Sequence, residues 1–366
     1  MIDVLRRWYE RNFANPQTVI LALILIVSGA LIFFFSEHLA PILVSVVIAY
    51  LFEGWVQKLE RIGVSRSIAA SLMTALFITG ILLLFLVLLP LLTTQLTELF
   101  RELPRMLARG QQLLSQLPQR YPDYVSEQQV QEILGMVRGE LSQLGQKIVT
   151  LSLSSVVNVI TFFVYLIVMP LLVFFFLKDK HLILYWLSRF LPEDRELVQD
   201  VWRELNIKIA SYVRGKFMEI AVVWVSSYIG FALMGLNYAM LLSLLVGLSV
   251  IIPYVGATVV TIPVMLIAFF QFGWSETFGY VMLIYGIIQF LDGNLLVPLL
   301  FSEVVNLHPV AIIIAVVFFG SLWGVWGVFF AIPLATLIQS VINVWPSQQR
   351  QLPKQPPAAA PPPAEG

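Results

Sequence analysis

The sequence predicts an all-α protein that crosses a membrane several times. Of its 366 residues, 59% are hydrophobic and 12% are charged, which is about half the charged fraction of a soluble domain. Long stretches also carry no charge at all, and an apolar helix of about 20 residues is enough to cross a bilayer. The charge-free runs are 17–36, 67–97, 148–177, 220–275 and 304–349.

Composition excludes several classes of function. The chain has no cysteine, which excludes disulfides, thiol catalysis and cysteine-ligated metals. Its 22 basic and 22 acidic residues balance, so we expect no nucleic-acid partner. The nucleotide-binding pattern GxxxxGKS/T and the hydrolase patterns HExxH and GxSxG are missing. We therefore expect neither an enzyme nor a cofactor or metal site, and the partner that the composition requires is a lipid bilayer.

Residues 1–92 are expected to form spans one to three. The basic lead and first apolar run look like a secretory signal, but no small-residue cleavage site follows Phe35, so we interpret an uncleaved first span at about 17–36. The second span is expected to begin at 38 and to continue to Leu59. The third covers about 68–92, and a fourth covers 154–177.

Two polar segments separate these spans. Residues 93–153 repeat apolar side chains every three or four positions, which predicts a helical hairpin that packs on itself or on the membrane, or else a gate or docking cap. Residues 178–219 form an amphipathic helical segment. Its apolar face carries Val198, Val201, Leu205, Ile209 and Tyr212. The Pro/Ala-rich tail, 346–366, is expected to be disordered.

The distribution of Lys and Arg predicts the orientation. These residues are frequent in the N-terminal lead, in 58–66 and in 178–216. Cytoplasmic segments carry this excess, and two spans separate each basic segment from the next. We therefore expect both termini and 178–219 to be cytoplasmic and 93–153 to lie outside.

The C-terminal membrane domain, 220–345, is expected to contain two broken helical segments, 240–271 and 309–345. Run 220–275 would be about 84 Å long as one helix, nearly three bilayers. It must turn, and we expect a turn at 235–237 and a break at 253–256. Residues 247–253 match 327–333 in spacing, with Ile-Pro at the end of each. The match indicates a repeat, unless it arises by chance or from close packing through small residues.

Broken segments point to a transporter's substrate region. A break frees backbone groups that must face protein or water. We therefore predict Pro253 and Gly256 to lie beside substrate or ion. The predicted hinge or break residues are Gly247, Pro253, Gly256, Gly293, Pro298, Gly327 and Pro333.

The stretch 289–298 is the most polar one within the membrane domain. Gln289 and Asp292 are three residues apart and share a helix face. Distortion at Gly293 and Pro298 would bring Asn294 to join them. An ionisable residue at membrane depth is a candidate functional group, so the three polar side chains are the predicted substrate- or ion-binding set. The alternative makes Asp292 an anchor at a helix end.

An ordered set of motifs resembles the autoinducer-2 exporter family. The motifs are LAPILVSVVIAYL (39–51), PLLVFFFLKDK (170–180), YVRGK (212–216), VGLSVIIPYVGATVVTIP (246–263), DGNLLVPLLFSEVVNLHP (292–309) and GVFFAIPLATLI (327–338). The resemblance implies about eight membrane segments in the cell inner membrane and a homo-oligomer, for which a pentamer is one candidate. It also implies a cytoplasmic motif of Lys178, Asp179, Arg214 and Gly215.

Members of that family are described as autoinducer-2 exporters or as sodium/proton antiporters. We therefore expect a secondary transporter, a permease or exporter of a small polar solute such as an autoinducer-2-like molecule, driven by a proton or sodium gradient. One alternative is sodium/proton antiport. The other is a membrane scaffold that holds partners without transport.

The orientation can be tested by cysteine labelling, because the chain has no cysteine of its own. We expect Arg120→Cys, within 93–153, to react with a membrane-impermeant maleimide in cells whose inner membrane is intact. Reaction only after the inner membrane is permeabilised would contradict the predicted orientation.

Overall fold

The protein is described here from a computed structural model. The structure describes residues 16–115, 155–190, 196–253, 255–301 and 307–344, with isolated positions between 128 and 139. Throughout these ranges the regular elements are helices, which confirms the all-α fold. Six described helices are long and apolar enough to cross a membrane, and three more are apolar but shorter. The expected number of about eight segments stays a prediction.

Several expectations fall outside the described residues. They concern the basic lead at 1–15, most of the second outer helix expected around 130–148, and the tail at 346–366. All of the candidate site positions are described. Tyr254, which lies between Pro253 and Val255 and is not one of them, falls outside the described residues.

The first helix, α2 (Pro16–Arg61), is bent. Phe35 has non-helical dihedrals (φ −117°, ψ 18°), and Pro41 follows within the helix. A proline removes a backbone donor and kinks a helix on its N-terminal side. Next, α3 (Arg66–Leu83) runs through a π-helical turn, η1 (Leu84–Leu88), into α4 (Leu89–Ser115). These 50 residues would span about 75 Å, far more than a bilayer core.

The chain divides into two compact units. The first contains residues 1–40, 181–215 and 301–366. It includes most of α8 (Lys180–Ser188), the first part of α9 (Glu196–Leu233), and α14 (Pro309–Val344). Its core confirms the predicted apolar face of α9. The residues that pack there are Val198, Val201, Leu205 and Ile209 of α9 with Leu21 and Leu25 of α2 and Leu337 and Val341 of α14.

The second unit contains residues 41–180 and 216–300 and has two cores. One joins the second arm of α2 to α3 and to α7 (Ser155–Lys178) through Ala49, Val56, Ala69, Ala70, Met73, Val173 and Leu177.

Ion pairs hold these helices together at one end. Arg66 pairs with Glu53 at 3.0 Å and with Glu60 at 3.1 Å, and its Nε donates to the Lys178 carbonyl at 3.2 Å. Lys180 pairs with Glu53 at 2.9 Å. The FLKDK motif therefore fastens α7 to the turn between α2 and α3.

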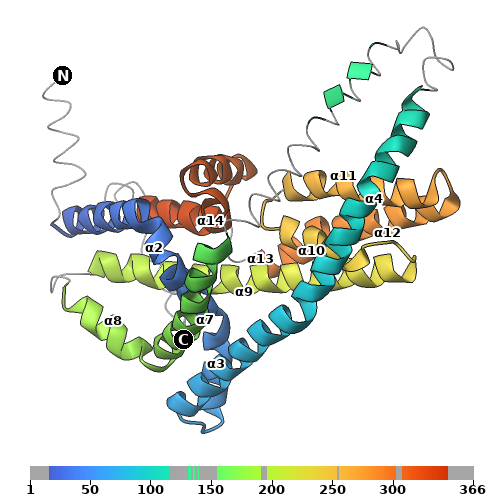
Figure 1. Ribbon diagram of the computed structural model, residues 1–366. Helices are drawn as coiled ribbons and strands as arrows, with labels where there is room; N and C mark the ends of the chain where they lie inside the picture. The colour runs from blue at the N-terminus through green and yellow to red at the C-terminus, as the bar shows by residue number, and fades with distance from the viewer. Residues whose placement is uncertain are drawn as a thin grey trace, which may run out of the picture. The chain divides into compact units, whose positions relative to one another are not determined.

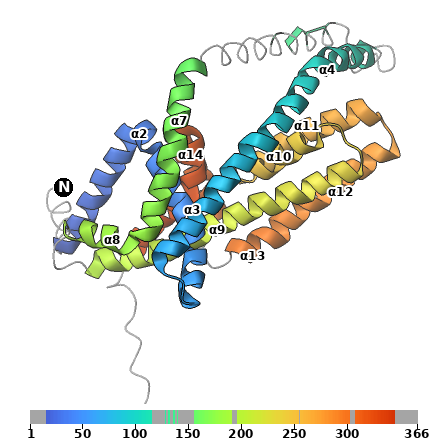
Figure 2. The same ribbon diagram turned by 60° about the horizontal axis from the view of Figure 1, so that its bottom comes forward.

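The other core is a helical bundle, visible in both views (Figures 1 and 2). It combines the second half of α9 with α10 (Ala239–Ser249), α11 (Val255–Phe272) and α12 (Glu276–Leu291). A π-helical turn, η2 (Asp292–Leu296), then leads into α13 (Val297–Phe301). The buried core residues are Val223, Phe231, Leu236, Tyr238, Leu242, Val246, Val250, Val260, Val264, Ile267, Ala268, Val281 and Tyr285.

The turn and the break predicted within 220–275 are both present. Helix α9 ends at Leu233, α10 ends at Ser249 and α11 begins at Val255. A Cβ atom on Gly256 would overlap the carbonyl oxygen of Ser249. Seven residues along a continuous helix would separate these positions by about 10 Å. The chain therefore reverses at a tight tip that only glycine fits.

Helix α14 is interrupted in a similar way. Gly324 adopts φ +59° and ψ −135°, a conformation that side chains disfavour. A Cβ atom on Gly327 would overlap the carbonyl oxygen of Phe319. The charge-free run 304–349 thus contains two helical arms that meet at a glycine, as α10 and α11 do.

The residue pairs aligned in the predicted repeat are nevertheless not equivalent. Gly247 lies inside α10 against Trp224, whereas Gly327 follows a break. The structural counterpart of Gly327 is Gly256. The dipeptide Ile-Pro occurs twice in the first segment, at 252–253 and at 262–263. Pro263 lies inside α11 as Pro333 lies inside α14, so the second copy corresponds to the Ile-Pro pair at 332–333.

The tip can be tested by adding one methyl group. We expect Gly256→Ala to lower the melting temperature of the purified protein, because overpacking costs about 1–3 kcal/mol. Gly279→Ala, in α12 with open space around its Cα, should be neutral or slightly stabilising. Equal melting temperatures for the two variants would contradict the tight tip.

Candidate functional site

A buried ion pair lies on α9, in the half that belongs to the bundle. Lys216 and Glu219 are 3% and 2% exposed, and their Nζ and Oε2 atoms are 2.6 Å apart. The two residues are three positions apart, so they lie on one face of the helix. They belong to a described helix that is long and apolar enough to cross a membrane. Charges are costly in such a place unless they are paired.

The same ammonium binds the break between α10 and α11. Lys216 Nζ donates a hydrogen bond of 3.0 Å to the carbonyl of Val250, the residue that caps the end of α10. Carbonyls at a helix end have no partner within their own helix. Lys216 therefore satisfies a backbone group that the break exposes, and it connects α9 to the tip.

Asp292 adds a second carboxylate. It is the first residue of the π-helical turn η2, a feature that is frequent at functional sites. Its Oδ1 atom is buried and has no hydrogen-bond partner among the described residues. Its charge interacts with those of Lys216 and Glu219. The cluster Lys216–Glu219–Asp292 thus holds two carboxylates and one ammonium, which we call the charge cluster.

The charge cluster lies far from the turns at one end of the bundle. Gln271 joins the α9–α10 turn to the end of α11: it accepts from the Asn237 N–H and donates to the Gly235 carbonyl, both at 2.8 Å. These turns therefore mark one end of the bundle. Lys216 is 17 residues from the end of α9, and Asp292 is 16 residues from the start of α12. Each lies about 25 Å from that end.

Unbalanced charge gives the cluster its chemistry. With all three groups ionised, the site carries one net negative charge, and Lys216, Glu219 and the Oδ1 atom of Asp292 are buried. Such a charge is costly unless another group neutralises it. A proton or a monovalent cation would do so, and the unpartnered Oδ1 of Asp292 is an available ligand atom.

Among the predicted binding residues, Gln289 belongs to a hydrogen-bonded chain next to the break. Its Nε2 donates to the Tyr285 hydroxyl at 3.1 Å. That hydroxyl bonds Thr261 Oγ1 at 2.8 Å and the Ala257 carbonyl at 3.1 Å. The chain links α12, one turn before Asp292, to the first turn of α11.

The structure does not bring Asn294 to Asp292. Asn294 is exposed, and its Nδ2 donates to the Phe290 carbonyl at 2.9 Å. Pro253 lies in the tip, and Gly256 is buried just beyond it. Gly293 and Pro298 are exposed on η2 and α13. The distortion expected from them takes the form of the π-helical turn.

The residues of the expected cytoplasmic motif have structural contacts. Lys178 Nζ lies over the Phe174 ring, 5.6 Å from its centre, and the Asp179 N–H donates to the Phe175 carbonyl at 2.8 Å. Arg214 donates to the Ala210 carbonyl. Gly215 faces Phe301 so closely that a Cβ atom would come within 2.8 Å of its ring.

Sequence reasoning missed Lys216 and Glu219. It assigned both to the amphipathic segment 178–219, yet α9 continues without interruption through residue 219 to Leu233. The available signal was their spacing. An oppositely charged pair at positions i and i+3 stands directly before the 56-residue charge-free run. A pair at this position lies where the helix enters the membrane domain.

Two further buried polar atoms lie on α9 beyond the cluster. Trp224 Nε1 and Ser227 Oγ have no hydrogen-bond partner among the described residues. Most buried polar atoms in proteins are paired with protein or water. These unpaired atoms are therefore consistent with water or a polar guest along this part of α9.

Comparison with known proteins agrees with this architecture. Residues 20–347 match the family model for "AI-2E family transporter". The chain is 48% identical over 349 residues to "Putative permease PerM" of Escherichia coli (strain K12), covering 95% of this chain and 99% of the relative. It is 28% identical over 345 residues to "Putative transport protein YueF" of Bacillus subtilis (strain 168), covering 90% and 92%.

A family match over most of the chain and several apolar helices of membrane-spanning length lead to the same conclusion: the chain belongs to the AI-2E transporter family and is a multi-pass membrane protein.

Proposed function

We propose that the protein is a secondary transporter of the inner membrane, and that the charge cluster couples transport to a proton or sodium gradient. The transported molecule is a small polar solute such as an autoinducer-2-like compound. The observation that carries the proposal is the excess of one carboxylate, half-buried Asp292, at the buried Lys216–Glu219 pair that bonds the tip of a broken helical segment. A site of this kind responds to a proton or a cation because only their binding balances its charge.

The coupling would act through Lys216. Its ammonium contacts both Glu219 and the Val250 carbonyl of the tip. When a proton or sodium ion neutralises Asp292, Lys216 loses one of the two negative charges that attract it. Its pairing with Glu219 and its bond to the tip then change in strength. A change in charge thereby becomes a change in how the α10–α11 hairpin is held against α9.

Sodium/proton antiport is a second candidate, and Asp292 favours it. A carboxylate oxygen without a hydrogen-bond partner suits a hard cation. If sodium and a proton compete for this oxygen, exchange follows without any organic solute. A scaffold without transport is less well supported, because a scaffold has no need for unbalanced charge inside its membrane helices.

The rest of the proposed assembly comes from sequence patterns and family resemblance. We propose cytoplasmic termini because two spans separate each basic segment from the next, which places these segments on the same side of the membrane, and basic segments are typical of the cytoplasmic side. We also propose a homo-oligomer, with a pentamer as one candidate. These features affect where the cluster lies in the membrane but are not needed for its charge balance.

The decisive variant is Asp292→Asn, which keeps the shape of the side chain and removes its charge. In proteoliposomes with an imposed proton or sodium gradient, we expect it to abolish gradient-coupled uptake. Asp292→Glu should retain part of the activity. Glu276→Gln is the matched control, since it removes an exposed carboxylate from the start of the same helix, and it should transport normally.

Three measurements make the result interpretable. Dye-monitored sodium/proton exchange and uptake of labelled autoinducer-2 separate the two candidate functions. Size-exclusion chromatography verifies that Asp292→Asn assembles as the unmodified protein does. Normal transport by Asp292→Asn at several pH values would remove the charge cluster from the mechanism and favour a helix-end anchor.

A further inference from the structure

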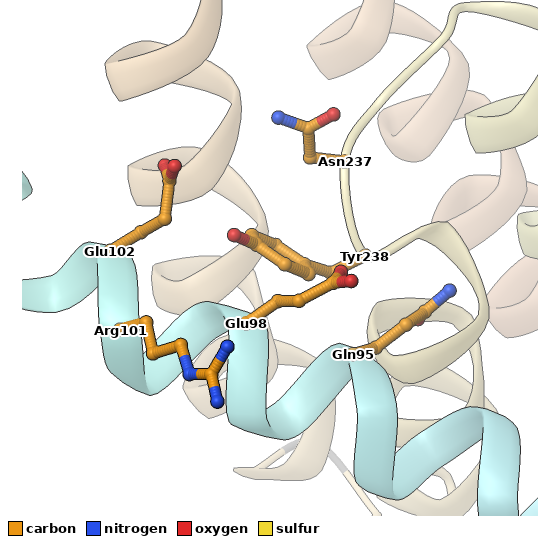
Figure 3. Close-up of a pocket in the computed structure, with 6 residues that line it drawn as sticks. All are labelled: Gln95, Glu98, Arg101, Glu102, Asn237 and Tyr238. Atoms are coloured by element: carbon orange, nitrogen blue, oxygen red, sulfur yellow. The ribbon is translucent and has the colours of Figure 1, made fainter.

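A pocket of about 370 Å³ lies at the turn between α9 and α10, next to α4 (Figure 3). Its volume is in the range of small-molecule sites. Each side chain that lines it carries a polar group. The lining residues are Gln95, Glu98, Arg101, Glu102, Asn237 and Tyr238.

Tyr238 is the most unusual of these residues. It is 8% exposed and adopts φ 58° and ψ 29°, the left-handed region that a tyrosine normally avoids. Strain of this kind costs roughly 1–3 kcal/mol and is concentrated at functional sites. The ring lies beside the Glu98 and Glu102 side chains (Figure 3), yet no hydrogen bond joins its hydroxyl to a described residue.

The phenol is held in its donor form. Burial raises the pKa of Tyr238, and the charges of Glu102 and Glu98 raise it further. The group therefore keeps its proton at physiological pH. The residue is mostly buried, whereas its O–H group faces the pocket without a partner among the described residues, so the group is available to donate a hydrogen bond to a ligand atom.

The walls of the pocket are fixed by backbone contacts. Gln95 Oε1 accepts from the Leu241 N–H at 2.9 Å, which joins α4 to the start of α10. The Asn237 N–H donates to Gln271 Oε1 at 2.8 Å. The side chains that line the pocket are thus presented by elements that hold one another in place.

We propose that this pocket binds a small organic cation. Glu98 and Glu102 are four residues apart on α4, and like charges at this spacing repel each other. An ammonium group between them would remove the repulsion. The Tyr238 ring can add a cation–π contact, and its hydroxyl can bond a polar group of the ligand.

The side chains of Arg105 and Arg101 do not take the place of this ammonium group. Arg105 approaches Glu102 only at 3.8 Å and is 86% exposed, so its effect is screened by solvent. The guanidinium of Arg101 is turned away from the Glu102 carboxylate (Figure 3). A metal ion fits less well than an organic cation, because within the described part of the chain no three His, Cys, Asp or Glu residues gather to hold one.

The pocket and the charge cluster are distinct sites. The pocket lies at the end of the bundle from which Lys216 and Asp292 are about 25 Å distant. In the predicted orientation this end faces outward, so the ligand would arrive from outside the cell. The binding proposal therefore does not rest on the proposed coupling function.

The test is isothermal titration calorimetry on the purified full-length protein in lipid nanodiscs. The probes are choline, putrescine and 3,3-dimethyl-1-butanol, the neutral isostere of choline. We expect saturable binding of at least one of the two cations and none of the isostere. Glu98→Gln and Glu102→Gln should each weaken binding about tenfold or more, and Tyr238→Phe several-fold. Added salt should weaken binding as well.

Matched variants separate this site from the rest of the protein. Glu276→Gln, an exposed carboxylate that does not line the pocket, should bind the cation normally. Asp292→Asn should also bind it normally even if transport is lost. Unchanged melting temperatures for Glu98→Gln and Glu102→Gln would show that the fold is intact.

Four results would overturn the proposal. They are absence of saturable binding for both cations, equal binding of the neutral isostere, preference for an anion such as succinate, and unchanged affinity in the Glu98 and Glu102 variants. Loss of binding in Asp292→Asn would contradict the independence of the two sites.

Discussion

The contact between Lys216 and the Val250 carbonyl determines how the C-terminal bundle can be built. A helix that breaks inside an apolar region exposes backbone groups, and each unsatisfied group there costs several kcal/mol. The 3.0 Å bond from the Lys216 ammonium satisfies one of them. That ammonium is itself buried and needs a counter-charge, which Glu219 supplies at 2.6 Å. Removing one partner of such a pair typically costs about 3–5 kcal/mol.

Close packing around the tip follows from this contact. Gly256 allows the chain to turn back against Ser249, and Gly247 allows α10 to approach Trp224 on α9. The Tyr285 hydroxyl then binds the Ala257 carbonyl in the first turn of α11. Bonds from side chains on α9 and α12 therefore hold both sides of the interruption. The second carboxylate, Asp292, enters a site whose local charge is already balanced, which is why it creates an excess.

Much of this fold could be predicted because its signals are local. Charge-free runs locate the apolar helices, and the excessive length of 220–275 requires the turn at Gly235 and the break after Ser249. The apolar face of α9 follows from helical spacing alone. Asp292 could be singled out because acidic residues are rare in its surroundings, whereas Asn294 could not be placed, since a π-helical turn alters the face on which each residue lies.

Other features depend on contacts between distant residues. The pairing of Lys216 with Val250 joins positions 34 residues apart, and neither residue identifies the other in the sequence. Spacing alone pairs 247–253 with 327–333, because the sequence does not reveal that Gly256 and Gly327 are the glycines that touch a carbonyl oxygen in space. The polar pocket could not be predicted either, since it brings α4 beside a turn more than 130 residues later. A left-handed tyrosine has no recognised sequence signature.

The central claim is that one of the two carboxylates near Lys216, buried Glu219 or half-buried Asp292, must bind a proton or a cation. The most direct measurement is infrared difference spectroscopy of the reconstituted protein between pH 6 and pH 8 in sodium-free buffer. Exposed carboxyl groups are already ionised in this range, because their pKa values are about 4. We predict a protonated-carboxyl band in the sodium-free state that disappears as sodium is added, and that is missing from Asp292→Asn. A spectrum without such a band in the unmodified protein, unchanged by sodium, would contradict the account.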